Sequence, residues 1–155
     1  MINNVDIKII DASLDKLSID NTIAKELIAS YSFKCDKFKV QIETGDLRLL
    51  MITWKIEILA NHQNADRDSI KLETTIGTVF KINNIDIVLG LADHKIQNAE
   101  LMLSIFDLSY STARGLIDSV AKGTAFHGAL LPLVDPMKLV SGFEELVKVD
   151  VLYQR

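Results

Sequence analysis

The chain has one cysteine and two prolines among its 155 residues. Because Cys35 stands alone, neither an intramolecular disulfide nor a cysteine-based zinc site can form within one chain. Such cysteine usage fits a reducing compartment, and we expect a cytoplasmic protein. Residues 1–10 carry acidic and amide side chains where a signal peptide would carry basic residues followed by an apolar run, so no signal peptide is expected.

Positive charge and long apolar runs are also scarce. The 17 Lys and Arg residues are outnumbered by 21 Asp and Glu residues, which gives a net charge of −4. Nucleic-acid binding depends on an excess of cationic side chains, so this charge argues against nucleic acid and favours a basic partner. No apolar run approaches the ~18–20 residues of a membrane span, and we expect no membrane insertion. With 48% hydrophobic residues, residues 1–155 can still form a single domain with a full core.

Catalytic and cofactor-binding patterns are missing as well. The glycines are scattered and form no phosphate-binding loop, which argues against ATP hydrolysis. His62, His94 and His127 lie far apart, without the spacing of metal ligands, and are interpreted as loop histidines. We therefore expect no cofactor, no metal site and no enzymatic activity.

The chain does contain several alternations of apolar and polar residues at period two. The clearest covers residues 47–59 and predicts a long, half-buried strand, and a shorter one precedes it at residues 38–42. A third covers residues 70–82, with Gly77 as an expected bulge or bend. A further extended segment is expected from residue 5 to about residue 20. Together these patterns predict an antiparallel meander preceded by one more strand.

The second half of the chain changes to a helical period. Apolar residues recur at intervals of three and four over residues 113–121, Gly123 marks the helix end, and the helix start before Ser111 is left open. Residues 135–136, Asp-Pro, predict the start of a second helix, and the run at residues 147–153 either continues that helix or leaves it. Strands followed by helices indicate an α+β fold: a four-stranded antiparallel sheet (meander) with a long helix and a second C-terminal helix packed on one side.

Four segments in the correct order over residues 5–140 resemble the SecB family of protein-export chaperones and its divergent relatives. "ARGLIDSVAKGTAF" is similar to the family's Ala-Arg helix and its Lys-Gly end, and "LLPLVDPMKL" to the loop that leads into the last helix. "LETTIGTVFKI" and "KLSID" resemble strand segments of the family. Within these motifs the positions interpreted as structural are Gly77, Phe80, Arg114 and Gly123.

The resemblance implies a homotetramer, assembled as a dimer of dimers, that holds non-native polypeptides without ATP. A sheet covered by helices on one side also leaves one row uncovered unless another subunit covers it, and that row is either Leu47, Leu49 and Met51 or the opposite one. The loop at residues 126–134, together with one sheet face, is the expected client site, because unfolded clients need adaptable apolar walls. The candidate client-binding residues are Trp54, Phe126, Leu130, Leu131, Leu133 and Val134. Phe126, Leu130 and Leu131 could equally pack under the second helix as core, and Trp54 fits a core or interface position better than a client contact.

By the same resemblance, acidic side chains on the outer sheet face would dock the translocase motor ATPase. Asp20 and Glu73 match that pattern, and their role would be charge complementarity with a basic partner surface. Lys16 and Lys71 lie beside them and dilute the charge, so both acids could equally be ordinary solvated carboxylates.

Two functions stay open at this point. One is a general holdase for unfolded or precursor polypeptides, with protein export and translocation as its setting. The other is a dedicated-partner subunit that binds one protein, such as an antitoxin, without general chaperone activity. A small-molecule-binding or enzymatic domain would need convergent polar groups in a pocket, and the sequence offers no candidate set.

Overall fold

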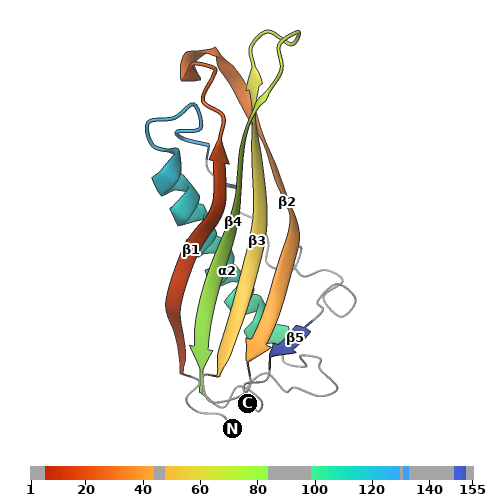
Figure 1. Ribbon diagram of the computed structural model, residues 1–155, viewed down its shortest axis with the longest axis vertical. Coiled ribbons are helices and arrows are strands. Elements are labelled where there is room, and N and C mark those ends of the chain that lie inside the picture. Colours follow the sequence, from red (N-terminus) through yellow and green to blue (C-terminus); the bar gives the residue numbers. More distant parts are fainter. Residues whose placement is uncertain (1–5, 44–47, 84–98, 130, 133–148, 153–155) are drawn as a thin grey trace.

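The computed structural model describes residues 6–43, 48–83, 99–129, 131–132 and 149–152, which form a long twisted sheet with one α-helix along one face (Figure 1). The elements are β1 (Ile7–Ile19), the short 3-10 helix η1 (Lys25–Leu27), β2 (Ile28–Glu43), β3 (Leu49–His62), β4 (Ile70–Ile82), α2 (Ala99–Ala121) and β5 (Val149–Leu152). An antiparallel sheet with a helix on one side confirms the α+β class. The second C-terminal helix was expected over residues that lie outside the described part of the chain.

The strand order is β1-β4-β3-β2-β5. β2, β3 and β4 form the predicted meander, but β1 pairs with β4, so the four antiparallel strands are arranged as a Greek key. Residues 20–27 carry the chain from the β1 edge of the sheet to β2. β5 pairs in parallel with residues 40–43 of β2, and the sheet therefore has five strands where the sequence predicted four. The alternating patterns indicate strands but do not say which strands are neighbours. β5 falls within the run at residues 147–153, for which the sequence left open whether it continues the second helix or leaves it.

Irregular pairing is concentrated in the outer strands β1 and β2. Gly77 pairs with both Ser13 and Thr53 without a change of register, so the bulge predicted at Gly77 is wrong. A bulge bends and twists its strand, and it is commonest near a sheet edge, where pairing on one side leaves room for an extra residue. The register shifts lie between Ile9 and Asp11 and between Asp15 and Ser18 in β1, and between Ile28 and Ser30 and between Lys34 and Lys37 in β2.

The core lies between the sheet and α2. We call the sheet face that α2 covers the helix side and the opposite face the outer face. Alternate residues of β3 and β4 point to the helix side, as their period-two pattern predicts, while Leu49 and Met51 lie half-exposed on the outer face. The largest fully buried side chains of the sheet and helix are Trp54, Phe80, Phe106, Ile42, Leu50, Ile52, Ile56, Ile58, Leu72, Ile76 and Ile82.

The helix ends as its sequence predicts. α2 stops at Ala121, and Gly123 follows with φ of +77°, a left-handed conformation that glycine adopts at little cost. Ala113 and Ile117 are buried against the sheet, whereas Leu116 is half-buried. The last part of α2 therefore packs its apolar face against the sheet, and the chain then leaves the helix at Gly123 and enters the following loop.

Candidate functional site

Trp54 lies at the centre of the interface between β3 and α2. Its side chain is 1% exposed, and its ring meets those of Phe106 and Tyr110 edge-on at 6.1 and 5.9 Å between centroids. The indole Nε1–H donates to Ser109 Oγ at 2.8 Å, and the Ser109 hydroxyl lies 3.3 Å from Thr78 Oγ1, so a buried polar chain joins β3, α2 and β4. In this conformation Trp54 presents no surface to a client, and its predicted client role stays a prediction.

The loop after α2 is held against the protein by side-chain donors from two elements. The Tyr31 hydroxyl on β2 donates to the carbonyl of Ala125 at 2.6 Å. From α2, the Tyr110 hydroxyl donates to the Pro132 carbonyl and Arg114 Nε–H to the Leu131 carbonyl, both at 2.8 Å. These bonds fix the backbone at three points along residues 125–132.

Of the predicted client residues in this loop, the structure describes two, Phe126 and Leu131, and both are buried. Phe126 and Leu131 have almost no exposed surface, and the Phe126 ring lies 6.3 Å from the Tyr31 ring between centroids. Leu130, Leu133 and Val134 lie outside the described residues. Within the described part, the loop thus turns its apolar side chains inward.

The two tyrosines that hold the loop are kept protonated by their surroundings. Burial raises the pKa of the Tyr31 hydroxyl above its usual value. The pKa of Tyr110 is raised chiefly by burial and further by Cys35, against a lowering effect of the Arg114 charge. Both hydroxyls therefore remain neutral donors at physiological pH.

An apolar surface remains open on the helix side of β2, beside this loop. Tyr31 and Phe33 pair in register with the buried Ala60 and Ile58 and so point to the same face as the core. α2 packs mainly on β3 and β4, and Phe33 is left 36% exposed. We call Tyr31, Phe33 and the half-buried Cys35 the β2 apolar surface.

Asp20 and Glu73 are brought together at the outer face. The backbone N–H of Asp20 donates to the carbonyl of Lys71 at 3.0 Å, and Ser18 pairs in register with Glu73. Glu73 lies 3.5 Å from the Lys71 ammonium and 3.7 Å from that of Lys55. Lys71, which was predicted to dilute the acidic charge, thus does so by forming a direct ion pair with Glu73.

Known proteins resemble the chain in structure and not in sequence. No protein-family model matches it, and no curated protein matches it at a significant level. Among solved structures, the SecB-like chaperone Rv1957 of Mycobacterium tuberculosis, in complex with a ChAD peptide from the antitoxin HigA1 (Rv1956), matches with a TM-score of 0.57 at 13% identity. The match covers 83% of this chain and 90% of that chain. This chain has a SecB-like fold. The family resemblance read from the sequence is confirmed at the level of the fold.

The residues that sequence reasoning missed in this SecB-like fold are Tyr31 and Phe33. Tyr31, Phe33 and Cys35 alternate with polar residues at period two, so a strand signal was present. The register shift between Lys34 and Lys37 interrupts it, and the sequence therefore predicted the strand to begin only at residue 38.

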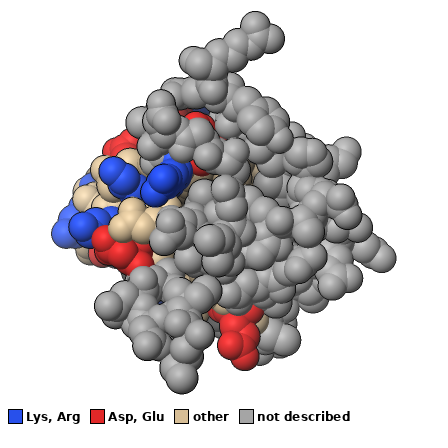
Figure 2. Space-filling model, turned by 90° about the horizontal axis from the view of Figure 1, so that it is seen from below, with Lys and Arg blue, Asp and Glu red and all other residues tan. Residues whose placement is uncertain are grey.

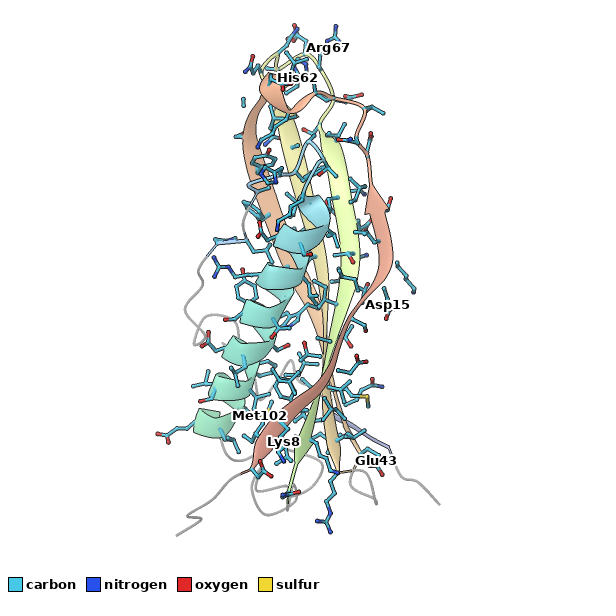
Figure 3. All side chains as sticks on the ribbon, turned by 90° about the vertical axis from the view of Figure 1, so that its left-hand side faces the viewer. Lys8, Asp15, Glu43, His62, Arg67 and Met102 are labelled. Carbon is cyan, nitrogen blue, oxygen red and sulfur yellow. The ribbon has the colours of Figure 1, made fainter. Side chains whose placement is uncertain are left out.

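The charged and titratable groups of the SecB-like fold are dispersed. His62 and Arg67 lie at the tip of the β3–β4 hairpin, far from Lys8 and Glu43 at the opposite end (Figure 3). That opposite end mixes Lys and Arg with Asp and Glu among its described side chains (Figure 2), as in the pair of Lys8 with Asp6 at 3.5 Å.

The described residues include no group of three metal-ligating side chains. None of the helices in the described part of the chain has the length and apolarity of a membrane span.

Proposed function

We propose that this protein is an ATP-independent SecB-like chaperone, a holdase, that binds non-native polypeptides at the β2 apolar surface. The observation that carries the proposal is Phe33, a large apolar side chain left 36% exposed on the face that elsewhere forms the core. A non-native chain exposes apolar side chains and unpaired backbone, and this surface offers an aromatic contact on a strand close to the sheet edge. The SecB-like fold supports the same reading, and the proposed activity requires no catalysis.

The predicted client residues then have two kinds of role. Trp54, Phe126 and Leu131 are buried, and we assign them to the backing that holds Tyr31 and the loop in place. Leu130, Leu133 and Val134 remain proposed client contacts. The proposal thus moves direct contact from the buried residues to Phe33 and its neighbours.

Aggregation of guanidinium-unfolded citrate synthase, followed by light scattering without ATP, tests this function. Near-equal molar amounts of the wild-type protein should suppress scattering, and Phe33→Ser should lose most of that suppression because its apolar contact is gone. Leu17→Ser is the matched control, since Leu17 is 41% exposed, close to the value for Phe33, but lies on β1, at the opposite edge of the sheet. Both variants are first checked for native folding and assembly. Failure of the wild-type protein with several unrelated clients would contradict the general holdase.

A dedicated-partner function is the second candidate. It is favoured by the solved neighbour, which is a SecB-like chaperone in complex with an antitoxin peptide. On this reading the β2 apolar surface would bind one protein only. A toxin–antitoxin pair beside the gene, together with tight binding of that antitoxin and no effect on unrelated clients, would favour this second function.

We also propose that the chain assembles as a homotetramer, a dimer of dimers, in the cytoplasm. The outward face of α2 supports a further interface, because it carries Leu108, which is 47% exposed, among small exposed residues such as Ser104, Ser111 and Gly115.

Protein export is the finer part of the proposal and concerns Asp20 and Glu73. Docking of the translocase motor ATPase at these carboxylates must compete with the Lys55 and Lys71 ion pairs of Glu73. Lys55→Gln with Lys71→Gln should therefore strengthen binding of the isolated motor ATPase, and Asp20→Asn with Glu73→Gln should weaken it. Equal binding by all variants would argue against export through this face.

A further inference from the structure

β5 differs from the other strands of the described sheet in its length and in the direction of its pairing. It has 4 residues, whereas β2, on which it lies, has 16. It is parallel to β2, with register pairs from Val40↔Val149 to Glu43↔Leu152, and β2 is its one neighbour in the described sheet. The pairing lies at the end of β2 where Glu43 is found (Figure 3).

Each of these properties makes β5 the strand that opens at the lowest cost. Parallel pairing is slightly less stable per residue than antiparallel pairing, and a strand with a neighbour on one side gains one ladder of hydrogen bonds. Short segments with few supporting contacts open with free energies far below that of global unfolding. Opening of β5 would uncover a row of backbone donors and acceptors on β2, which is a template for an added strand.

The helix-side face of β2 is apolar beyond the β2 apolar surface itself. Val40 and Ile42 pair in register with Ile52 and Leu50 and are buried on the same side as Phe33. A chain laid along β2 would therefore place side chains beside Val40 and Ile42 and, further along the strand, beside Phe33. Residues 33–43 span roughly 35 Å in extended form, which leaves room for a client strand much longer than β5.

We propose that β5 is a built-in competitor for client binding: extended client segments with alternating apolar residues add to β2 at residues 40–43 in place of β5. The inference rests on the proposed chaperone function and names how its site is regulated. A client that pairs antiparallel to β2 and continues toward Phe33 forms a longer ladder than β5 does, so it displaces β5 once it is present. In the absence of a client, β5 covers residues 40–43 of this edge and prevents them from pairing with other copies of the chain.

The size of the effect follows from the fraction of time that β5 is docked. If the site is open for about one-fifth of the time, apparent affinity is lowered about fivefold relative to a protein without the competitor. Removing β5 from β2 should therefore tighten client binding about fivefold or more, and locking it in place should weaken binding below the wild-type level.

Two full-length variants in a Cys35→Ser background make this testable. Asp150→Pro with Val151→Pro removes adjacent backbone N–H groups, so one ladder donor is lost whichever of the two faces β2. Gln41→Cys with Asp150→Cys places cysteines at paired positions, where oxidation can lock β5 to β2 and reduction releases it. The probe is fluorescein-labelled, reduced and carboxymethylated α-lactalbumin, which stays unfolded, and binding is measured by fluorescence anisotropy.

We expect the proline variant to bind the probe about fivefold or more tightly than the Cys35→Ser parent. We expect the oxidised lock to bind more weakly than the same protein after reduction. Equal affinities for all of these proteins, or weaker binding by the proline variant, would overturn the proposal that β5 competes with clients for β2. The proposed chaperone function would remain in place, since the probe still binds. Absence of binding by the parent and by the proline variant alike, together with no suppression of aggregation, would overturn both.

Discussion

At Ser109 a single hydroxyl connects three elements, because it accepts from the Trp54 indole and lies within hydrogen-bond distance of the Thr78 hydroxyl. All of these groups are buried. Removing one member of a buried hydrogen-bonded set costs about 1–3 kcal/mol, since the remaining polar groups lose a partner away from water. We expect Ser109→Ala to lower the free energy of unfolding by about this amount, measured by guanidinium denaturation.

Ser104→Ala is the matched control for that prediction. Ser104 lies on the same helix but is exposed, and its hydroxyl donates to the Glu100 carbonyl at 3.3 Å. The change in helix propensity is the same in both variants. The difference between their free energies of unfolding therefore reports the contribution of the buried hydrogen bonds of Ser109. Equal free energies of unfolding for the two variants would show that the buried hydrogen bonds of Ser109 contribute nothing to stability.

Tyr31 and Tyr110 make the stability of the fold sensitive to alkaline pH. Both folded-state pKa values are raised above the ordinary value of 10.0, in each case chiefly by burial. Their contribution is therefore present at every pH below the unfolded value and is lost as pH rises through the folded value. We expect the free energy of unfolding to fall above about pH 10, and to fall less in a variant with Tyr31→Phe and Tyr110→Phe. Denaturation curves, with tyrosinate absorbance as the monitor of ionisation, would decide; parallel curves for the two proteins would contradict the assignment.

Single residues were predictable from the sequence where a local rule applied to them. Gly123 was placed correctly because a helix end requires a left-handed residue, and +77° is observed. Phe33 was missed because exposure of an aromatic residue depends on how far α2 reaches across the sheet, which no local pattern contains. The sequence favoured a core or interface position for Trp54 and left open whether Phe126 and Leu131 are core residues, and all three are buried in the structure.

At the scale of the element, the end of α2 depends on the backbone of Gly123. An added Cβ would meet nothing within 4 Å, so any cost of a substitution comes from the left-handed conformation alone. That conformation costs a residue with a Cβ roughly 1–2 kcal/mol. We expect Gly123→Ala to lower the free energy of unfolding by about 1 kcal/mol, and Lys122→Ala, at the exposed neighbouring position, to change it by less than about 0.5 kcal/mol.

Elements were recovered from the sequence where apolar alternation was uninterrupted. The predicted bounds of β4 agree with those observed, Ile70–Ile82, because that strand is central and its pattern has no bulge. β2 was predicted too short because its register shift breaks the pattern. The pairing of β1 with β4 was missed because strand order is set by long-range packing, on which a period-two pattern carries no information.

At the scale of the whole molecule, α2 covers one face of the long sheet, and apolar surface remains exposed on both the sheet and the helix among the described residues. Leu49 and Met51 are half-exposed on the outer face, and Leu108 is exposed on the outward face of α2. From the sequence we expected one uncovered row, since a sheet with helices on one side leaves one row uncovered, but the sequence did not decide between the row of Leu49 and Met51 and the opposite row. The second depends on the rotation of α2 about its axis, which becomes visible only in the fold.

The exposed Leu108 leads to a prediction about assembly. A charged side chain at the centre of an interface between copies would have to be desolvated without a partner, which strongly disfavours association. We expect the wild-type protein to elute with a mass near four times the 17.3 kDa of one chain, and Leu108→Glu to elute at half that mass or less, by size-exclusion chromatography with light scattering. Leu27→Glu is the control, since Leu27 is similarly exposed but lies in η1, between β1 and β2. A wild-type mass of one chain, or an unchanged mass for Leu108→Glu, would show that this face of α2 is not an interface, and Leu108 would then be a second exposed apolar contact available to clients.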